Sequence, residues 1–275
     1  KRSTIYPDYR YHLRLLATSV TGTEELGIIS GGVTFNPDPA YATSPITLDG
    51  IIVTGTITSS SYGSNVGGLI GDAGGGTNAI ATRVSFDGRI NAPLVSEVGG
   101  IFGYGSGSIA QGSATGSVTG LDRVSGRAKA PNGAITDSYS QMSVTATGTR
   151  PGDQYAATGF SARLTSRGSI SDSYAAGTVT GTEKAGFIAW WEDGGTPSGG
   201  TVSNSFFDNT LAPPTDTAPT GVLTVTVNPP LSRYAGSNLP SLTPTSTATM
   251  KTASTYSLWS SSIWNLTDGS YPTLK

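Results

Sequence analysis

The sequence contains no cysteine, only one histidine and few charged residues. The absence of cysteine among 275 residues excludes disulfides, thiolate metal ligands and a cysteine nucleophile. Charged residues make up 12% of the chain, about half of the usual ~25%. With 16 basic and 18 acidic residues, the net charge is −2. This balance argues against nucleic acid as a partner, because binding to phosphates needs a basic surplus.

Long apolar runs and helical periodicity are missing as well. No apolar stretch approaches the ~18 residues that span a membrane, so we expect no membrane span. No window keeps an i, i+3, i+4 apolar pattern without a break by glycine, proline or a Ser/Thr cluster. Residues 1–7 lack the apolar core of a signal peptide, so we expect either a mature chain or a piece of a longer one.

Short segments rich in β-branched residues occur throughout the chain. Each is bounded by glycine, asparagine, aspartate or proline, as in 51–57, 116–119, 177–180 and 222–227. This pattern predicts many short strands and an all-β fold.

Three sequence elements recur in a fixed order. The first has small residues followed by apolar ones, and its markers Gly68, Gly100, Gly126, Gly159 and Gly186 are spaced by 32, 26, 33 and 27 residues. The second reads Ile-x-x-Ser-Tyr or a variant of it, at 135–140, 170–175, 202–207 and, in a degenerate form, 81–86. The third, Gly-x-Val/Ile, occurs at 88–90, 116–118 and 177–179.

Three short strands in each repeat of 26 to 33 residues predict the coils of a β-solenoid, in which equivalent positions stack on one another. No coil buries its own face, so the stability would come from stacking. The paired glycines predict positions of positive φ or of close approach between coils.

These motifs resemble the GLUG repeat of large bacterial surface and secreted proteins, including adhesin-like and filamentous-haemagglutinin-like proteins. Residues 65–210 carry the resemblance, and the ending Trp264…Asp268-Gly269-Ser270-Tyr271-Pro272-Thr273-Leu274 is similar to the ending that often follows such repeats. The resemblance implies a right-handed β-solenoid (β-helix) on a cell surface and no particular activity. The predicted fold is therefore an all-β, right-handed β-solenoid of roughly five to eight coils with terminal caps.

The chain divides into four predicted regions. Residues 1–20 form an amphipathic strand, 21–207 the solenoid, 208–250 an extended segment rich in proline and threonine, and 251–275 a C-terminal cap. We expect Trp259 and Trp264 to pack inside that cap.

Catalytic residues are hard to assemble from this sequence. His12 is the only histidine, no Gly-x-Ser-x-Gly motif follows a strand, and the acids are scattered. Asp137, Asp172 and Asn204 share one repeat position. Their side chains fit caps of backbone N–H groups at turns, and a calcium site is the alternative. We expect no catalytic residue, no metal and no cofactor.

Trp190, Trp191, Glu192 and Asp193 form a candidate ligand-binding site. Adjacent strand residues face opposite sides, so the two tryptophans cannot both point inward. One is expected either to contact a sugar or protein, or to pack beneath residues 208–230.

The N-terminal strand is a candidate subunit contact through Arg10, Tyr11, Leu13 and Leu15. It either caps its own chain or adds to a neighbouring chain and links copies head to tail.

The sequence favours a non-enzymatic, extracellular structural and adhesive module of a bacterial cell-surface protein. Its expected partners are other copies of itself, a larger surface protein, or a glycan or protein of a host or the environment. One alternative is a subunit of an extracellular filament joined by strand exchange, and a second is a polysaccharide-active enzyme.

Overall fold

The computed structural model describes residues 11–23, 25–32, 47–73, 79–105, 107–128, 133–149, 156–165, 168–192, 200–212 and 242–275. Strands dominate, and the only helices in this part of the chain are two single turns, α1 (Thr247–Met250) and the 3-10 helix η2 (Ala253–Tyr256). The strands are β1 (Tyr11–Gly22), β2 (Ser30–Gly32), β3 (Thr47–Ser59), β4 (Gly63–Gly67), β5 (Ile70–Asp72), β6 (Ala79–Thr82), β7 (Ser85–Gly99), β8 (Phe102–Tyr104), β9 (Gly107–Ala110), β10 (Ser113–Ser125), β11 (Ala134–Ala146), β12 (Ala156–Thr158), β13 (Ser161–Thr165), β14 (Ser169–Ala175), β15 (Val179–Thr180), β16 (Glu183–Ala185), β17 (Ile188–Glu192), β18 (Thr201–Ser203), β19 (Ser205–Asp208), β20 (Leu242–Thr245), β21 (Trp264–Asn265) and β22 (Thr273–Leu274). The all-β prediction is confirmed.

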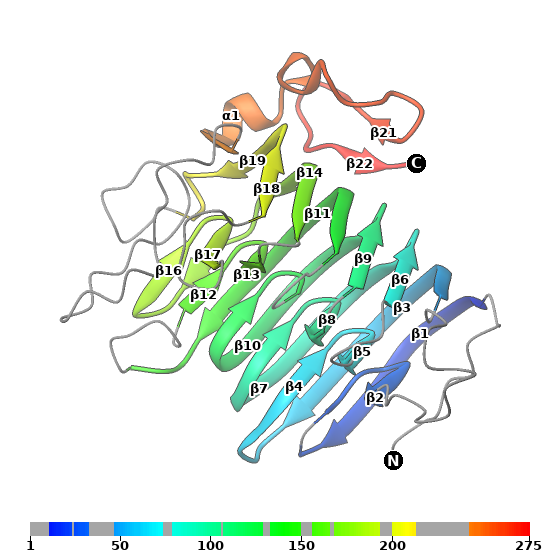
Figure 1. The fold of residues 1–275 in the computed structure, drawn as a ribbon, viewed down its shortest axis with the longest axis vertical. Coiled ribbons are helices and arrows are strands. Elements are labelled where there is room, and N and C mark those ends of the chain that lie inside the picture. The colour runs from blue at the N-terminus through cyan, green and yellow to red at the C-terminus, as the bar shows by residue number, and fades with distance from the viewer. Residues whose placement is uncertain are drawn as a thin grey trace.

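Fifteen of these strands form one sheet whose pairings are all parallel. Paired residues of this sheet lie 26 to 38 positions apart, as in Ser113 with Tyr139 and Leu13 with Ile51. Figure 1 shows the strands side by side from β1 to β19, with β21 and β22 beyond β14 and β11. Within the part of the chain that the structure describes, only β21 and β22 pair antiparallel. A parallel pairing at each repeat brings equivalent positions of successive repeats into adjacent strands.

Six strands of this sheet close into a ring of parallel pairings, in the order β3, β6, β9, β11, β10, β7 and back to β3. The ring closes because long strands divide their pairings: residues 47–49 of β3 pair with β6 and residues 52–58 with β7. Similarly, residues 135–136 of β11 pair with β9 and residues 139–146 with β10. The core is thus a closed six-stranded parallel barrel with further strands attached, and the prediction of a right-handed β-solenoid of five to eight coils is wrong. The repeat spacing indicates which residues are neighbours, but it does not reveal closure.

The marker glycines lie where successive strands approach each other closely. A Cβ atom added to Gly68, Gly100, Gly126 or Gly159 would lie 2.1–2.2 Å from the carbonyl oxygen of the next marker glycine. Such a contact is far below the van der Waals distance, so any side chain here would push the strands apart. The expected close approach is confirmed.

Arg127 is a buried cation inside this packing. It is 0% exposed and follows Gly126, where the other repeats place Leu69, Ile101, Phe160 and Phe187. Its guanidinium carbon lies 5.3 Å from the centroid of the Phe160 ring. Within the described part of the chain, none of its three guanidinium nitrogens has a hydrogen-bond partner. Burial lowers the pKa of Arg127 to about 9.

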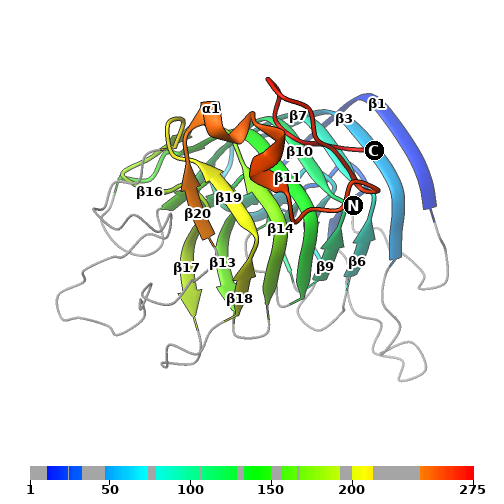
Figure 2. The same ribbon diagram turned by 90° about the horizontal axis from the view of Figure 1, so that it is seen from above.

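Residues 246–275, which we call the C-terminal segment, pack on the outer face of the sheet. Tyr174 of β14 is buried there together with four residues of the segment, Met250, Tyr256, Trp259 and Trp264. Figure 2, seen from above, shows the segment crossing over β11 and β14. Both tryptophans are buried, as the sequence predicts.

Hydrogen bonds fix the C-terminal segment in place. The indole of Trp259 donates to the carbonyl oxygen of Asn204 at 2.9 Å, and the hydroxyl of Tyr174 donates to that of Pro272 at 2.6 Å. Asp208 is 1% exposed and accepts hydrogen bonds from the hydroxyls of Tyr271 at 2.6 Å and of Thr247 at 2.7 Å, as well as from two backbone N–H groups. The segment is thus joined to the sheet by polar contacts at both of its ends.

The N-terminal strand lies in the chain's own sheet. β1 pairs with β3, and Leu15 is partly buried against the core. Tyr11 and Leu13 belong to this strand, and Arg10 lies outside the described residues. This is the arrangement that the capping alternative predicts, and strand exchange between chains stays a prediction.

The region predicted as extended, 208–250, contains β20 paired with β19, followed by α1. Residues 213–241 lie outside the described part. No helix among the described residues is long and apolar enough to cross a membrane.

Candidate functional site

One row of outward-facing side chains runs across neighbouring strands. Strand register places its members side by side, and we call them the outer row: Ile52, Ser85, Ser113, Tyr139, Tyr174 and Phe206. The second half of this row is aromatic and packs against the C-terminal segment. The first half consists of two serines and Ile52, whose side chain is 44% exposed.

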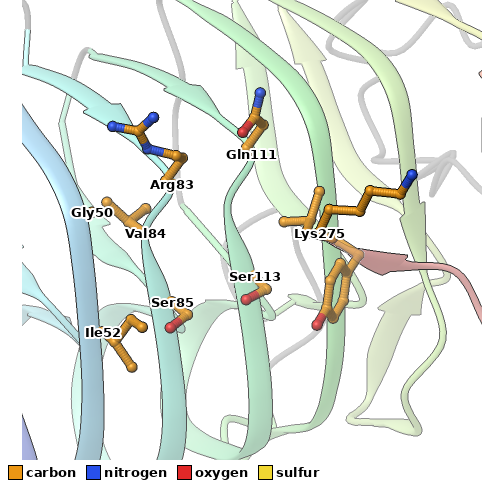
Figure 3. A pocket seen from close by; sticks show the side chains of 10 residues that line it. Gly50, Ile52, Arg83, Val84, Ser85, Gln111, Ser113 and Lys275 are labelled. Atoms are coloured by element: carbon orange, nitrogen blue, oxygen red, sulfur yellow. The ribbon is translucent and has the colours of Figure 1, made fainter. Parts of the chain in front are cut away.

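A groove of about 400 Å³ lies over the first half of the outer row. Its floor includes Ile52, Ser85, Ser113 and Tyr139, and the end of the C-terminal segment contributes Leu274 and Lys275. Figure 3 shows Ile52, Ser85 and Ser113 following one another on adjacent strands, with Lys275 at the other end. The groove therefore begins where the C-terminal segment stops covering the sheet.

A row of left-handed residues forms one rim of the groove. Gly50, Arg83 and Gln111 have φ values of 67°, 53° and 52°. Each directly follows one of the residues Asp49, Thr82 and Ala110, which pair across the adjacent strands. Positive φ at the same position of each strand turns the chain in the same way each time. As a result, the polar side chains of Arg83 and Gln111 stand side by side at the rim (Figure 3).

The same row continues beyond the groove through Asp137, Asp172 and Asn204, with φ values of 48°, 48° and 44°. Asp137 accepts a hydrogen bond from the indole of Trp264 at 3.2 Å, and Asp172 accepts one from the Asn204 amide at 3.3 Å. Burial, more than the nearby Asp172 charge, raises the pKa of Asp137. Among the described residues, no three acidic or histidine side chains gather to hold a metal ion. Asp137 and the carbonyl oxygen of Asn204 thus hold the C-terminal segment, whereas Asp172 contacts Asn204.

Tyr139 ends the aromatic half of the outer row. Its ring stacks on that of Tyr174, with centroids 5.2 Å apart and planes inclined by 9°. One face of the Tyr139 ring is used in this way. On the other side lies Ser113 of the adjacent strand, whose side chain is hydrogen-bonded with the Tyr139 hydroxyl. Burial raises the pKa of the Tyr139 hydroxyl, so this group is a neutral hydrogen-bonding group at ordinary pH.

The cations of the groove are already paired with groups of the protein. Arg83 forms an ion pair with Asp49, and the ammonium of Lys275 donates to the carbonyl oxygen of Ser261. The side chain of Arg83 is nevertheless 56% exposed. The groove therefore has a floor that combines the apolar surfaces of Ile52 and Tyr139 with two serine hydroxyls, polar groups at its rim, and no concentrated charge.

The site predicted from the tryptophan pair is only partly visible. Trp190, Trp191 and Glu192 lie on β17, paired with Arg163, Leu164 and Thr165 of β13. The structure describes their backbone, and Asp193 lies outside the described residues. The proposed ligand contact at 190–193 stays a prediction, as does the subunit contact through Arg10, Tyr11, Leu13 and Leu15.

The groove residues were not singled out from the sequence. The available signal was the replacement of the repeat tyrosine by Ser85 in the degenerate copy and by Ser113 in the next one. Comparisons with protein-family models, curated proteins and solved structures find no match for this chain.

Proposed function

We propose that the chain is a non-enzymatic structural and adhesive module of a bacterial cell-surface protein, and that the groove is its adhesive site. The observation that carries this proposal is the interruption of the outer row. The C-terminal segment covers the aromatic half, whereas an aromatic ring and the exposed Ile52 face the open half. Apolar surface combined with a small number of polar groups is typical of a binding site.

The scaffold suits a mechanical role. Successive repeats are joined by parallel ladders, and the marker glycines are packed so closely that the strands cannot shift without clashes. A groove on such a sheet keeps its shape under load, which benefits a surface protein that holds a ligand.

The test is retention of the protein on polymers of known chemistry, including polysaccharides and an unglycosylated protein. Ser113→Tyr should fill the groove, and we expect this variant to lose retention. A reducing-end assay on the same polysaccharides checks the non-enzymatic part. Release of new reducing ends by the wild type would contradict it, and unchanged retention of Ser113→Tyr would contradict the assignment of the groove.

A further inference from the structure

The groove occupies the place where further aromatic side chains would continue the stacked row. Neighbouring strands in a sheet are about 4.8 Å apart, which is close to the 5.2 Å between the rings of Tyr139 and Tyr174. A ring at position 113 would therefore continue the stack on Tyr139, and one at position 85 would follow it. Serine at both positions leaves this volume empty, between Tyr139 at one end and Ile52 at the other.

A ligand that completes the stack must be flat, and the polar groups of the rim require hydrogen-bonding groups at its edges. The Tyr139 face can pack against an apolar surface of one ring. The surroundings of that ring are polar: the hydroxyls of Ser85 and Ser113 beneath it, the amide of Gln111 and the exposed guanidinium of Arg83 at its edge. Arg83 and Ser113 already have partners in Asp49 and the Tyr139 hydroxyl. An aromatic side chain would still place an apolar edge against the Gln111 amide and the Ser85 hydroxyl in a partly desolvated groove, which is unfavourable.

A pyranose meets both requirements. Its axial C–H groups form an apolar face, and its equatorial hydroxyls point outward in the plane of the ring, where they can donate and accept. Gln111 offers both an amide N–H₂ and a carbonyl oxygen, and the serine hydroxyls also act in both senses. This set of groups matches a neutral sugar, since Arg83 already has its counterion in Asp49.

We propose that the groove binds one hexopyranose unit of a polysaccharide, stacked on the free face of Tyr139 over Ser113. This inference rests on the proposed adhesive function and names its ligand class. Tyr139 is the stacking platform, Gln111 holds the hydroxyls at the edge, and Ile52 closes the far end of the groove. The flanking sugar units extend past the rim, because the groove is open to solvent there.

The experiment measures binding of cellohexaose, mannohexaose, maltohexaose and galactohexaose to the full chain by titration calorimetry. We expect the wild type to bind at least one of them, and Ser113→Tyr to weaken this binding at least tenfold by occupying the sugar's place. Ser143→Tyr is the matched control, because Ser143 is exposed on β11 and does not line the groove. It should bind as the wild type does. Circular dichroism and the unfolding midpoint verify that both variants fold.

A second variant tests the edge of the ring. Gln111→Gly keeps the left-handed backbone, since glycine adopts positive φ readily, and removes the amide. We expect binding to weaken several-fold with no loss of fold. Equal hexaose binding by the wild type and Ser113→Tyr would overturn the inference, and so would failure of the wild type to bind any of the four hexaoses.

The polymer experiment distinguishes this failure from failure of the adhesive function. If the unglycosylated protein polymer retains the wild type but not Ser113→Tyr, while no hexaose binds, the groove is adhesive and its occupant is an aromatic or aliphatic side chain. That result overturns the inference that the ligand is a sugar, but it agrees with the proposed adhesive function. If Ser113→Tyr changes neither measurement, both are overturned.

Discussion

Replacing Arg127 by methionine should make the protein more stable. The guanidinium is fully buried, and its three nitrogens lack hydrogen-bond partners within the described part of the chain. Each tenfold change in proton affinity is worth ~1.4 kcal/mol, so a pKa lowered from 12.5 to about 9 corresponds to about 5 kcal/mol of desolvation cost. The Phe160 ring 5.3 Å away returns about 1–2 kcal/mol of this through a cation–π contact.

Methionine keeps the unbranched stem of arginine and adapts to irregular space, so it should fill most of the volume. Allowing for some loss of packing, we expect Arg127→Met to raise the free energy of unfolding by about 2–4 kcal/mol. The assay is urea denaturation at pH 7, followed by circular dichroism. Arg123→Met is the control. Arg123 is ion-paired with Glu97, and its removal leaves a carboxylate without that partner, so this variant should lose stability.

The pH dependence provides a second check. Below pH about 9, both the native and the unfolded chain carry the Arg127 charge, and its cost is present in full. As the pH rises through this value, the native chain releases a proton that the unfolded chain keeps, so the wild type gains stability. The advantage of Arg127→Met should therefore shrink at high pH. A loss of 2 kcal/mol or more in Arg127→Met at pH 7 would refute the reasoning, because a methionine cavity alone should not outweigh removal of an unpaired buried charge.

Three further predictions concern packing and the C-terminal segment. Gly100→Ala should lower the free energy of unfolding by more than ~3 kcal/mol, because its Cβ would lie 2.1 Å from a carbonyl oxygen. Gly269→Ala, at φ 86° in open space, should lower it by only ~1 kcal/mol, and thermal unfolding compares the two variants. Asp208→Ala should lower the free energy of unfolding by about 3 kcal/mol, because it removes four hydrogen bonds to a carboxylate. Limited proteolysis should then cleave within 246–275, and resistance equal to that of the wild type would contradict the role of Asp208 in holding the C-terminal segment. Asp137→Asn keeps an acceptor for Trp264 without a charge, so its stability relative to the wild type should increase as pH rises through the raised pKa of Asp137. An increase at low pH instead would contradict the assigned direction of the shift.

The repeat positions could be read from the sequence because parallel pairing preserves them. The marker glycines do stack, and Tyr139 does pair with Tyr174, which in turn pairs with Phe206. Even the departure at position 127 was visible as a basic residue in an apolar element. Each of these features depends only on residues one repeat apart.

Closure and the groove depend on more distant parts of the chain, which the repeat pattern does not encode. The ring closes because the two ends of β3 and of β11 pair with different strands. The groove ends where Leu274 and Lys275 happen to lie, and Trp264 reaches Asp137 across 127 residues. No local sequence pattern predicts where a terminal segment docks. The change from aromatic residues to serine along the outer row therefore did not predict a groove.

The docking of the C-terminal segment also dictates an order of events during folding. Its surface on the sheet includes Tyr139, Tyr174 and Phe206, which lie on three different strands. That surface does not exist until these strands have paired, and each pairing must first close a chain loop of some 30 residues, which makes such contacts slow to form. Burial of Trp259 and Trp264 should therefore be the last kinetic phase of refolding. Until then the aromatic row is exposed to solvent, and this is the interval in which the chain is most prone to aggregate.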